Sequence, residues 1–304
     1  MPNFDYLPKD ILTSKVFLTA STMLTEITNS SHDGRNISFF TAGKEDKPTV
    51  LLACPVGISC LLLVKLIEFL HQDYFVITWE SRGLPNYYAD DRIEEWSPDS
   101  HAKDILTVVN ALNRNVDHAI SFCSGSYPLL YALANRYIHA SSLCLISSPI
   151  ELAELEDRTS YQEAFIPLLP RIAESGIGMA KLVRSLIKQG VRSSETGVED
   201  TLLYINNLPF EKDEHTYRYA LLHSRWINLS WQDVITKITI PTFIVHGEMD
   251  KTAHLSGAKM LAQNIKGAVL SIVNGHGHFL MYSEPSVLPN IQGFLNSVPG
   301  SFSK

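Results

Sequence analysis

The residue best placed to do chemistry in this sequence is Cys123, in the segment 121–126 (SFCSGS). The apolar run 118–122 precedes it directly, and a helical apolar pattern follows. A sharp strand-to-helix turn strains the backbone of the residue at its tip and lifts that side chain clear of the sheet. Ser121 and Gly125 are the small neighbours that such a turn needs, because strand and helix nearly touch there. The pattern makes Cys123 a candidate nucleophile, which would act as its thiolate.

Two later segments carry the acid and the base that such a nucleophile needs. Asp250 lies in 246–250 (HGEMD), directly after a buried strand run, and His278 lies in 275–280 (GHGHFL), after the next strand run. The carboxyl ends of parallel strands meet at one edge of a sheet, so we expect the three side chains to lie close together. The chain order nucleophile, acid, histidine is typical of hydrolases in which three strand ends converge.

Alternatives remain open at each of these positions. Shifting the frame of the turn by one residue makes Ser124 the nucleophile, although Phe122 then occupies a position that requires a small residue. A buried cysteine at a strand end can also serve packing alone. His276 is an alternative base and Glu248 an alternative acid, whereas His246 ends a strand and is expected to be structural.

The elements that must position these residues alternate between strand and helix. Turn residues 32–35 predict a hairpin between two short β-branched runs. Beyond it, alternation of strands with helices of about 10–15 residues predicts a parallel sheet with right-handed crossovers. The strand runs of this part are 49–53, 74–78, 118–122 and 142–146.

Residues 151–235 interrupt the alternation with helical segments and no convincing buried strand. The sheet pattern then resumes with strand runs in 238–245 and 268–273. We therefore predict an α/β core made of residues 1–150 and 236–304, with 151–235 inserted as a helical cap. Open α/β sheets bind ligands at the carboxyl ends of their strands, so the cap is expected there.

These motifs resemble the α/β-hydrolase superfamily over essentially the whole chain apart from the cap. The cysteine at the turn resembles those of dienelactone hydrolases, polyester synthases and some thioesterase-like acyltransferases. Residues 54–57 (CPVG) depart from the usual His-Gly after the third strand. The stretches that carry the resemblance are DGRNISFFTAGKEDKPTVLLACP, YFVITWESRGLP, FCSGS, PTFIVHGEMD and NGHGHFLMYSEP.

The resemblance implies a role for each residue. Cys123 would form an acyl-enzyme, and His278 would take the thiol proton and deliver it to the leaving group. Asp250 would fix the imidazole tautomer. The backbone N–H groups of Ser124 and Val56 would bind the developing oxyanion.

Further residues are candidates for the surroundings of the site. Gly57 and Trp79 follow strand ends and are expected to line the substrate pocket, with ordinary packing as the alternative. Glu80 and Arg82 stand where the superfamily usually has Asp-x-Arg-Gly, and we expect an internal ion pair that braces this loop.

The cap contains a basic stripe without acidic residues in its window. Lys181, Arg184 and Lys188 fall at i, i+3 and i+7 on one helix face. The stripe is expected either to dock phosphopantetheine or an acyl carrier protein, or simply to face solvent. Apolar residues of the same helix would cover the site and favour a hydrophobic acyl chain; they are Leu182, Val183, Leu186 and Ile187.

Composition narrows the function class. The 304 residues carry 25 Lys and Arg against 32 Asp and Glu, a net charge of −7, which argues against nucleic acid as a partner. The four cysteines form no CxxC pair, and neither a metal site, a nucleotide-binding loop nor any cofactor is expected. No secretory leader or run of roughly 18 apolar residues is visible, so we expect a cytoplasmic protein that is not membrane-bound.

These observations favour a cysteine-dependent hydrolase or acyltransferase of acyl thioesters or esters. Exchange between thioesters is nearly thermoneutral, so transfer of the acyl group competes with hydrolysis. A carbon–carbon bond-forming or cleaving enzyme on a polyketide-like β-keto substrate is an alternative. A non-catalytic binding protein is a further alternative, although such a protein need not keep nucleophile, acid and histidine together.

Overall fold

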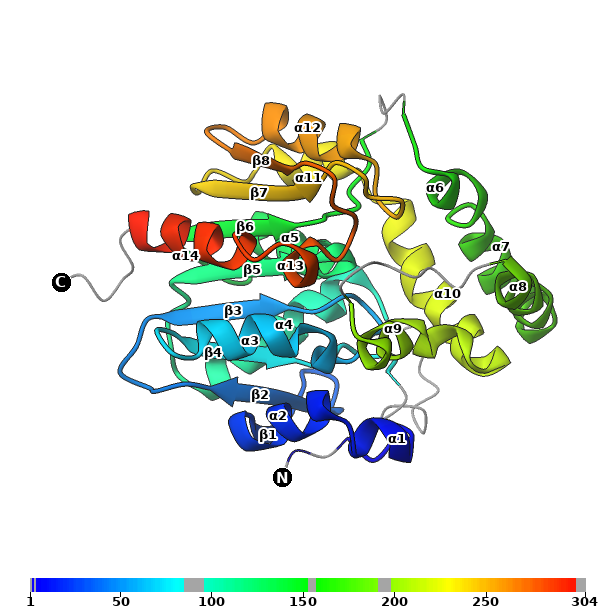
Figure 1. Ribbon diagram of the computed structural model, residues 1–304, viewed down its shortest axis with the longest axis horizontal. Helices are drawn as coiled ribbons and strands as arrows, with labels where there is room; N and C mark the ends of the chain where they lie inside the picture. Colours follow the sequence, from blue (N-terminus) through cyan, green and yellow to red (C-terminus); the bar gives the residue numbers. More distant parts are fainter. Residues whose placement is uncertain (1, 3, 85–95, 153–156, 191–197, 299–304) are drawn as a thin grey trace.

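Eight strands form a single twisted sheet in the order β1-β2-β4-β3-β5-β6-β7-β8 (Figure 1). The computed structural model describes residues 2, 4–84, 96–152, 157–190 and 198–298. The predicted hairpin is confirmed, since β1 pairs antiparallel with β2, and β2 is also antiparallel to β4. Every other neighbouring pair is parallel. The strands are β1 (Thr25–Ser30), β2 (Asn36–Ala42), β3 (Thr49–Ala53), β4 (Phe75–Trp79), β5 (His118–Phe122), β6 (Ser142–Ile146), β7 (Thr242–Gly247) and β8 (Val269–Val273).

Helices cover both faces of this sheet, as the continuous apolar strand runs require. In β3, Val50 and Leu52 join one apolar cluster, while Leu51 and Ala53 join the other, because successive side chains alternate between faces. The first face carries α1 (Lys9–Leu12), α2 (Lys15–Met23), the 3₁₀ turn η1 (Cys60–Leu63), α3 (Val64–Leu70), α13 (Leu280–Ser283) and α14 (Val287–Ser297). The second face carries α4 (Pro98–Ala111), α5 (Ser126–Ala134), α11 (Trp231–Ile235) and α12 (Leu255–Asn264).

Five helices stand beyond the carboxyl ends of the parallel strands, on the right in Figure 1. They share a small apolar cluster of their own, which includes Leu169, Ile172 and Val183. Helix α10 links this cap to the core, because its Leu221 and Leu222 pack on Val56. The cap helices are α6 (Ser160–Ala164), α7 (Leu168–Ser175), α8 (Ile177–Gly190), α9 (Asp200–Asn207) and α10 (Asp213–Ile227), with the 3₁₀ turn η5 (Leu208–Phe210) between the last two.

The predicted limits of the cap, 151–235, remain a prediction. Within them, α11 belongs with the core, since Trp231, Val234 and Ile235 join the apolar cluster of the second face. The rings of Trp231 and Tyr127 on α5 stack with centroids 5.1 Å apart. Among the described residues, no helix is both long enough and apolar enough to cross a membrane.

Candidate active site

Cys123 occupies the tip of a strained turn between β5 and α5. Its φ is +50°, in the left-handed region that a non-glycine residue adopts only at a cost of ~1–3 kcal/mol. It begins the 3₁₀ turn η4 (Cys123–Gly125), which runs directly into α5. Cys123 is only half-buried, whereas Cys54, Cys60 and Cys144 are buried. The backbone therefore presents this one thiol toward the end of the sheet.

Close packing maintains the strained conformation. A side chain on Gly125 would collide with the carbonyl oxygens of Ala53 and Cys54, so the turn lies directly against the end of β3. The Ser126 hydroxyl donates a hydrogen bond to the Cys123 carbonyl (2.9 Å) and accepts one from Ser148 (2.9 Å). These contacts offset the strain at Cys123 and confirm the need for a small residue at position 125.

His278 and Asp250 lie together in the loops that follow β8 and β7. The imidazole Nδ1 is 2.8 Å from the Asp250 Oδ2. Asp250 Oδ1 accepts hydrogen bonds from the backbone N–H groups of Thr252 (2.8 Å) and Ala253 (2.9 Å), which fix the carboxylate. Since Nδ1 faces Asp250, the other ring nitrogen of His278 faces Cys123, with which the ring forms a side-chain hydrogen bond.

The surroundings of His278 set the charge state of this pair. Burial lowers the pKa of His278, but the charges of Asp250 and Cys123 outweigh it and hold the pKa well above 6.5. Burial likewise raises the pKa of Asp250, and the neighbouring His278 reverses the effect and leaves the pKa below its usual value. The Phe122 ring packs against the imidazole with centroids 5.1 Å apart, excluding water from one side. The arrangement stabilises the imidazolium form that His278 adopts once it has taken a proton.

The alternative acid and base have other partners. His276 Nδ1 lies 2.9 Å from the Ser283 hydroxyl, and its Nε2 lies 3.4 Å from Glu284. Glu248 accepts a hydrogen bond from the backbone N–H of Gly275 (3.0 Å). His246 is buried and bonds the Ala253 carbonyl through Nε2 (2.9 Å), in keeping with a structural role.

The loop after β3, which was expected to supply an oxyanion donor, departs from the sequence-based expectation. The Val56 N–H, expected to be open to substrate, donates to the Ser124 hydroxyl at 3.1 Å. The Val56 carbonyl accepts from His223 Nε2 at 3.2 Å, and the Gly57 N–H donates to the Ser81 hydroxyl at 2.9 Å. Serine hydroxyl groups therefore accept hydrogen bonds from the backbone N–H groups of both Val56 and Gly57.

A small pocket adjoins this loop beneath the cap. Gly57, one of the two predicted pocket residues, lines it; Trp79 does not and is instead packed in the core at 4% exposure. Trp79 is the last residue of β4, and its side chain packs in the apolar cluster of the second face of the sheet. The length of the strand run does not predict which face this side chain joins. The pocket is lined by Gly57, Ser59, Gly83, Leu84, Leu208, Pro209, His215, Tyr219 and Leu222.

Three aromatic residues near the thiol were not anticipated from sequence. Tyr161 on α6 and Tyr219 on α10 form a side-chain hydrogen bond, and the charge of Cys123 acts on both. The Tyr219 and His223 rings contact each other at a tilt of 33°, with centroids 4.0 Å apart, and both lie over the loop after β3. The i, i+4 spacing of Tyr219 and His223 is a signal that could have found them, whereas Tyr161 has no local signal.

The expected ion pair between Glu80 and Arg82 after β4 is not formed, and each residue has other partners. Arg82 does not pair with Glu80; its Nε and Nη2 donate to Asp104 at 2.6 and 2.5 Å, and Nη1 lies 3.0 Å from Asp33. Glu80 is buried and accepts hydrogen bonds from Tyr6 (2.6 Å) and Ser59 (2.8 Å). Both residues follow the end of β4 (Phe75–Trp79), where strand alternation no longer fixes the direction of a side chain, so the sequence does not specify their partners.

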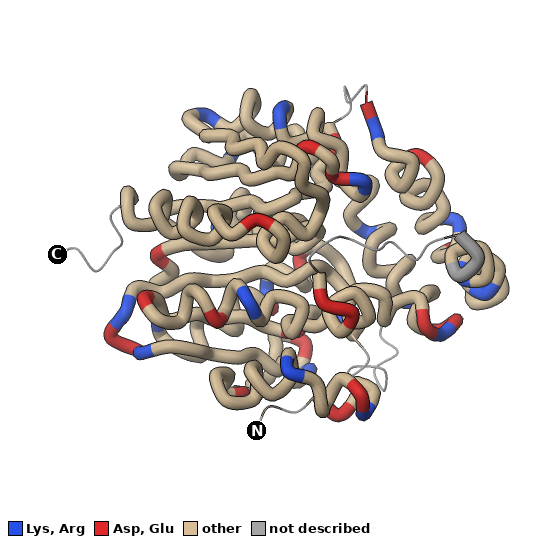
Figure 2. The backbone as a smooth tube through the Cα atoms, viewed as in Figure 1, with Lys and Arg blue, Asp and Glu red and all other residues tan. Residues whose placement is uncertain are grey.

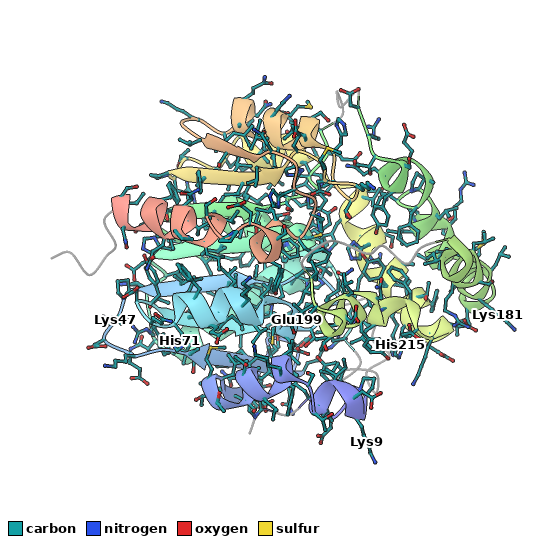
Figure 3. All side chains as sticks on the ribbon, viewed as in Figure 1. Lys9, Lys47, His71, Lys181, Glu199 and His215 are labelled. Carbon is teal, nitrogen blue, oxygen red and sulfur yellow. The ribbon has the colours of Figure 1, made fainter. Side chains whose placement is uncertain are left out.

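The basic stripe on α8 is interrupted in the structure. Arg184 Nε lies 2.5 Å from Asp213 on α10, so its charge is not free for docking. Lys181 projects from the outer end of the cap (Figure 3), where basic and acidic residues are mixed (Figure 2). The side chain of Lys188 lies outside the described residues. Leu182 and Leu186 are 56% and 58% exposed, so they do not cover the site as expected, and only Val183 of the four is buried.

No group of three or more His, Cys, Asp or Glu side chains in the described ranges could hold a metal ion.

No family model matches the chain. It is 24% identical over 277 residues to monoacylglycerol lipase abhd6-B of Xenopus laevis, covering 86% of this chain and 79% of the relative. It is 20% identical over 270 residues to 3-oxoadipate enol-lactonase 1 of Acinetobacter baylyi, covering 88% and 96%.

Solved structures agree on the architecture. The esterase EaEST from Exiguobacterium antarcticum superposes with a TM-score of 0.70 at 18% identity, over 90% of this chain and 100% of the esterase. The chain therefore has an α/β-hydrolase fold, and the relatives that it resembles in sequence are named as a lipase and an enol-lactonase.

Proposed function

We propose that this protein is a cysteine-dependent acyl hydrolase that works through an acyl-enzyme on Cys123, with His278 as base and Asp250 as its orienting carboxylate. One observation carries the proposal: a half-buried cysteine with φ +50° stands at the strand-to-helix turn. Beside it lies an imidazole whose Nδ1 is bonded to a buried carboxylate at 2.8 Å. A packing cysteine has no need of either feature.

In the proposed acylation, the Cys123 proton passes to His278 and Sγ bonds the carbonyl carbon, moving the carbonyl electron pair onto oxygen. Collapse of this intermediate expels the leaving group, which takes the proton from His278. In deacylation, His278 removes a proton from water, and the water oxygen attacks the thioester carbon. The carbon–sulfur bond then breaks, the acid product leaves and the thiolate returns. Asp250 holds the ring in the tautomer that both steps require.

Small-molecule acyl esters and thioesters are the proposed substrates. The monoacylglycerol lipase and the enol-lactonase named above are called after an ester and a lactone. The pocket beside Gly57 adds apolar walls from Leu84, Leu208 and Leu222, which suit an apolar acyl or alcohol group. Because the proposed acyl-enzyme is itself a thioester, transfer to a thiol or alcohol is a second outcome at the same site.

The test uses two donors that share one acyl group, p-nitrophenyl butyrate and the butyryl thioester of N-acetylcysteamine. Each is turned over in the presence of an added alcohol, and the ratio of butyrate to butyryl ester is measured. A common acyl-enzyme must give the same ratio from both donors, because the leaving group has already departed. Ratios that differ between the donors would contradict the mechanism. The size of the common ratio separates a hydrolase from an acyltransferase.

A further inference from the structure

Ser124, the residue after the proposed nucleophile, has a buried side chain with an unusual partner. Its hydroxyl accepts a hydrogen bond from the Val56 N–H at 3.1 Å, and the residue is only 4% exposed. Val56 N–H is the group that the superfamily resemblance assigns to the oxyanion. The hydroxyl therefore occupies the backbone donor that was expected to be open to the substrate.

The Val56 peptide is fixed from its other side as well. Burial lowers the pKa of His223 to about 4, so the ring is neutral at physiological pH. Its Nε2 lies 3.2 Å from the Val56 carbonyl, which can only accept, so this nitrogen carries the ring proton. Contact of the same ring with Tyr219, at a tilt of 33° and with centroids 4.0 Å apart, restricts its orientation. The Val56 N–H is thus locked toward Ser124.

We propose that the Ser124 hydroxyl is an oxyanion donor, so that this one residue stabilises the oxyanion twice, through its backbone N–H and its side-chain O–H. The inference rests on the proposed function of Cys123. A hydroxyl has one donor and two acceptor sites, so accepting from Val56 leaves its own proton available. Among the described residues no acceptor is found for that proton. The Val56 N–H acts behind it, polarising the hydroxyl and strengthening its donated bond.

During acylation the carbon–sulfur bond forms as the carbonyl electron pair moves onto oxygen. The Ser124 O–H donates to that oxygen without giving up its proton, and the hydrogen bond weakens again when the carbonyl re-forms and the leaving group departs. A competing account makes the hydroxyl a plug that withholds the Val56 N–H from substrate. The two accounts predict opposite signs when the hydroxyl is removed.

The experiment compares wild type, Ser124→Ala and Ser121→Ala. Ser121 is the matched control, because its hydroxyl is fully buried at the base of the same turn with no hydrogen-bond partner among the described residues. Acylation by p-nitrophenyl butyrate is followed as a stopped-flow burst of p-nitrophenolate. Alkylation by iodoacetamide is followed by intact mass, and it forms a carbon–sulfur bond without any oxyanion.

We expect Ser124→Ala to slow acylation about 100-fold, the effect of removing one oxyanion donor, while alkylation stays within about twofold of wild type. Ser121→Ala should match wild type in both reactions. Unchanged or faster acylation in Ser124→Ala would overturn the inference, and so would an equal loss in both reactions. Ser124→Cys, which keeps the volume with a weaker donor, provides the same comparison if the alanine variant unfolds at a lower temperature. Absence of any burst in wild type would instead contradict the proposed function of Cys123.

Discussion

The turn at Cys123 and the outer cap helix α8 fix their side chains in different ways. At the turn, the backbone itself places Cys123, since φ is +50° and Gly125 packs against the end of β3. On α8, the position of Arg184 is set by side-chain contacts, an ion pair with Asp213 on α10 and a hydrogen bond from Nη1 to the Glu211 carbonyl (3.3 Å). A site built on strand ends therefore tolerates few changes, whereas the cap surface can change its partners with little cost.

The largest expected effect is on activity at the turn. Cys123→Ala removes the nucleophile and should lower kcat by about 10⁶-fold while leaving the melting temperature within a few degrees. One equivalent of iodoacetamide should inactivate wild type equally, because the other three cysteines are buried. Full activity in Cys123→Ala with loss in Ser124→Ala would shift the nucleophile by one residue.

A second prediction concerns the carboxylate. Asp250→Asn replaces the acceptor of the His278 Nδ1–H with an amide, and should lower kcat by about 10⁴-fold, as for a misoriented imidazole in serine hydrolases. Glu248→Gln is the control, because Glu248 bonds Gly275 instead of the imidazole. A large loss in the Glu248 variant with an active Asp250 variant would reverse the assignment.

Two glycine substitutions compare how tightly the turn at Cys123 and helix α8 are packed, through the free energy of unfolding. Gly125→Ala forces a methyl group against the carbonyls of Ala53 and Cys54 and should cost about 1–3 kcal/mol of unfolding free energy. Gly178→Ala in α8 meets no atom within 4 Å and should be neutral or stabilise the helix by up to about 1 kcal/mol. Urea unfolding of both variants measures the contrast. Equal effects would mean that the turn is not tightly packed.

The pH dependence of stability tests the charge state of His278. Although burial lowers its pKa, Asp250 and Cys123 hold it well above 6.5. A raised pKa stabilises the fold fully below 6.5, and this contribution is lost as pH rises through the folded-state pKa. His278→Gln should therefore be destabilised most relative to wild type near about pH 6, and less near about pH 9. A difference that grows with pH would contradict the raised pKa.

The smallest effect is expected on α8. Arg184→Ala breaks a partly exposed ion pair with Asp213, whose side chains are 24% and 23% exposed, and should cost less than about 1 kcal/mol. Lys181→Glu should leave turnover of p-nitrophenyl butyrate unchanged. Urea unfolding and steady-state kinetics check both. A drop in kcat above about tenfold in either variant would show that α8 acts on the site, beyond what a surface pair explains.

The sequence predicted the features that depend on local backbone structure. The strand runs, the turn at Cys123 and the loops of Asp250 and His278 follow from apolar patterns and small residues at fixed spacing. Sequence did not predict pairings that depend on three-dimensional packing. Arg82 pairs with Asp104 instead of Glu80, and the Val56 N–H meets Ser124.

The cap residues were hardest to predict for the same reason. Tyr161 and Tyr219 meet across two helices that are about sixty residues apart in sequence, and neither helix has a pattern that specifies the other. Leu182 and Leu186 have the helical spacing of a buried face, yet α8 turns that face outward. Hydrophobic periodicity identifies a helix but not the direction in which an outer helix presents its faces.

The most direct test of the central claim is the mass of the enzyme during turnover. Wild type is mixed with p-nitrophenyl butyrate, quenched in acid within the burst and digested, and the peptide masses are recorded. The account predicts a butyryl adduct on the peptide that contains Cys123, and none on the same peptide from Cys123→Ala. Turnover without any adduct on that peptide, or with the adduct on another residue, would contradict it.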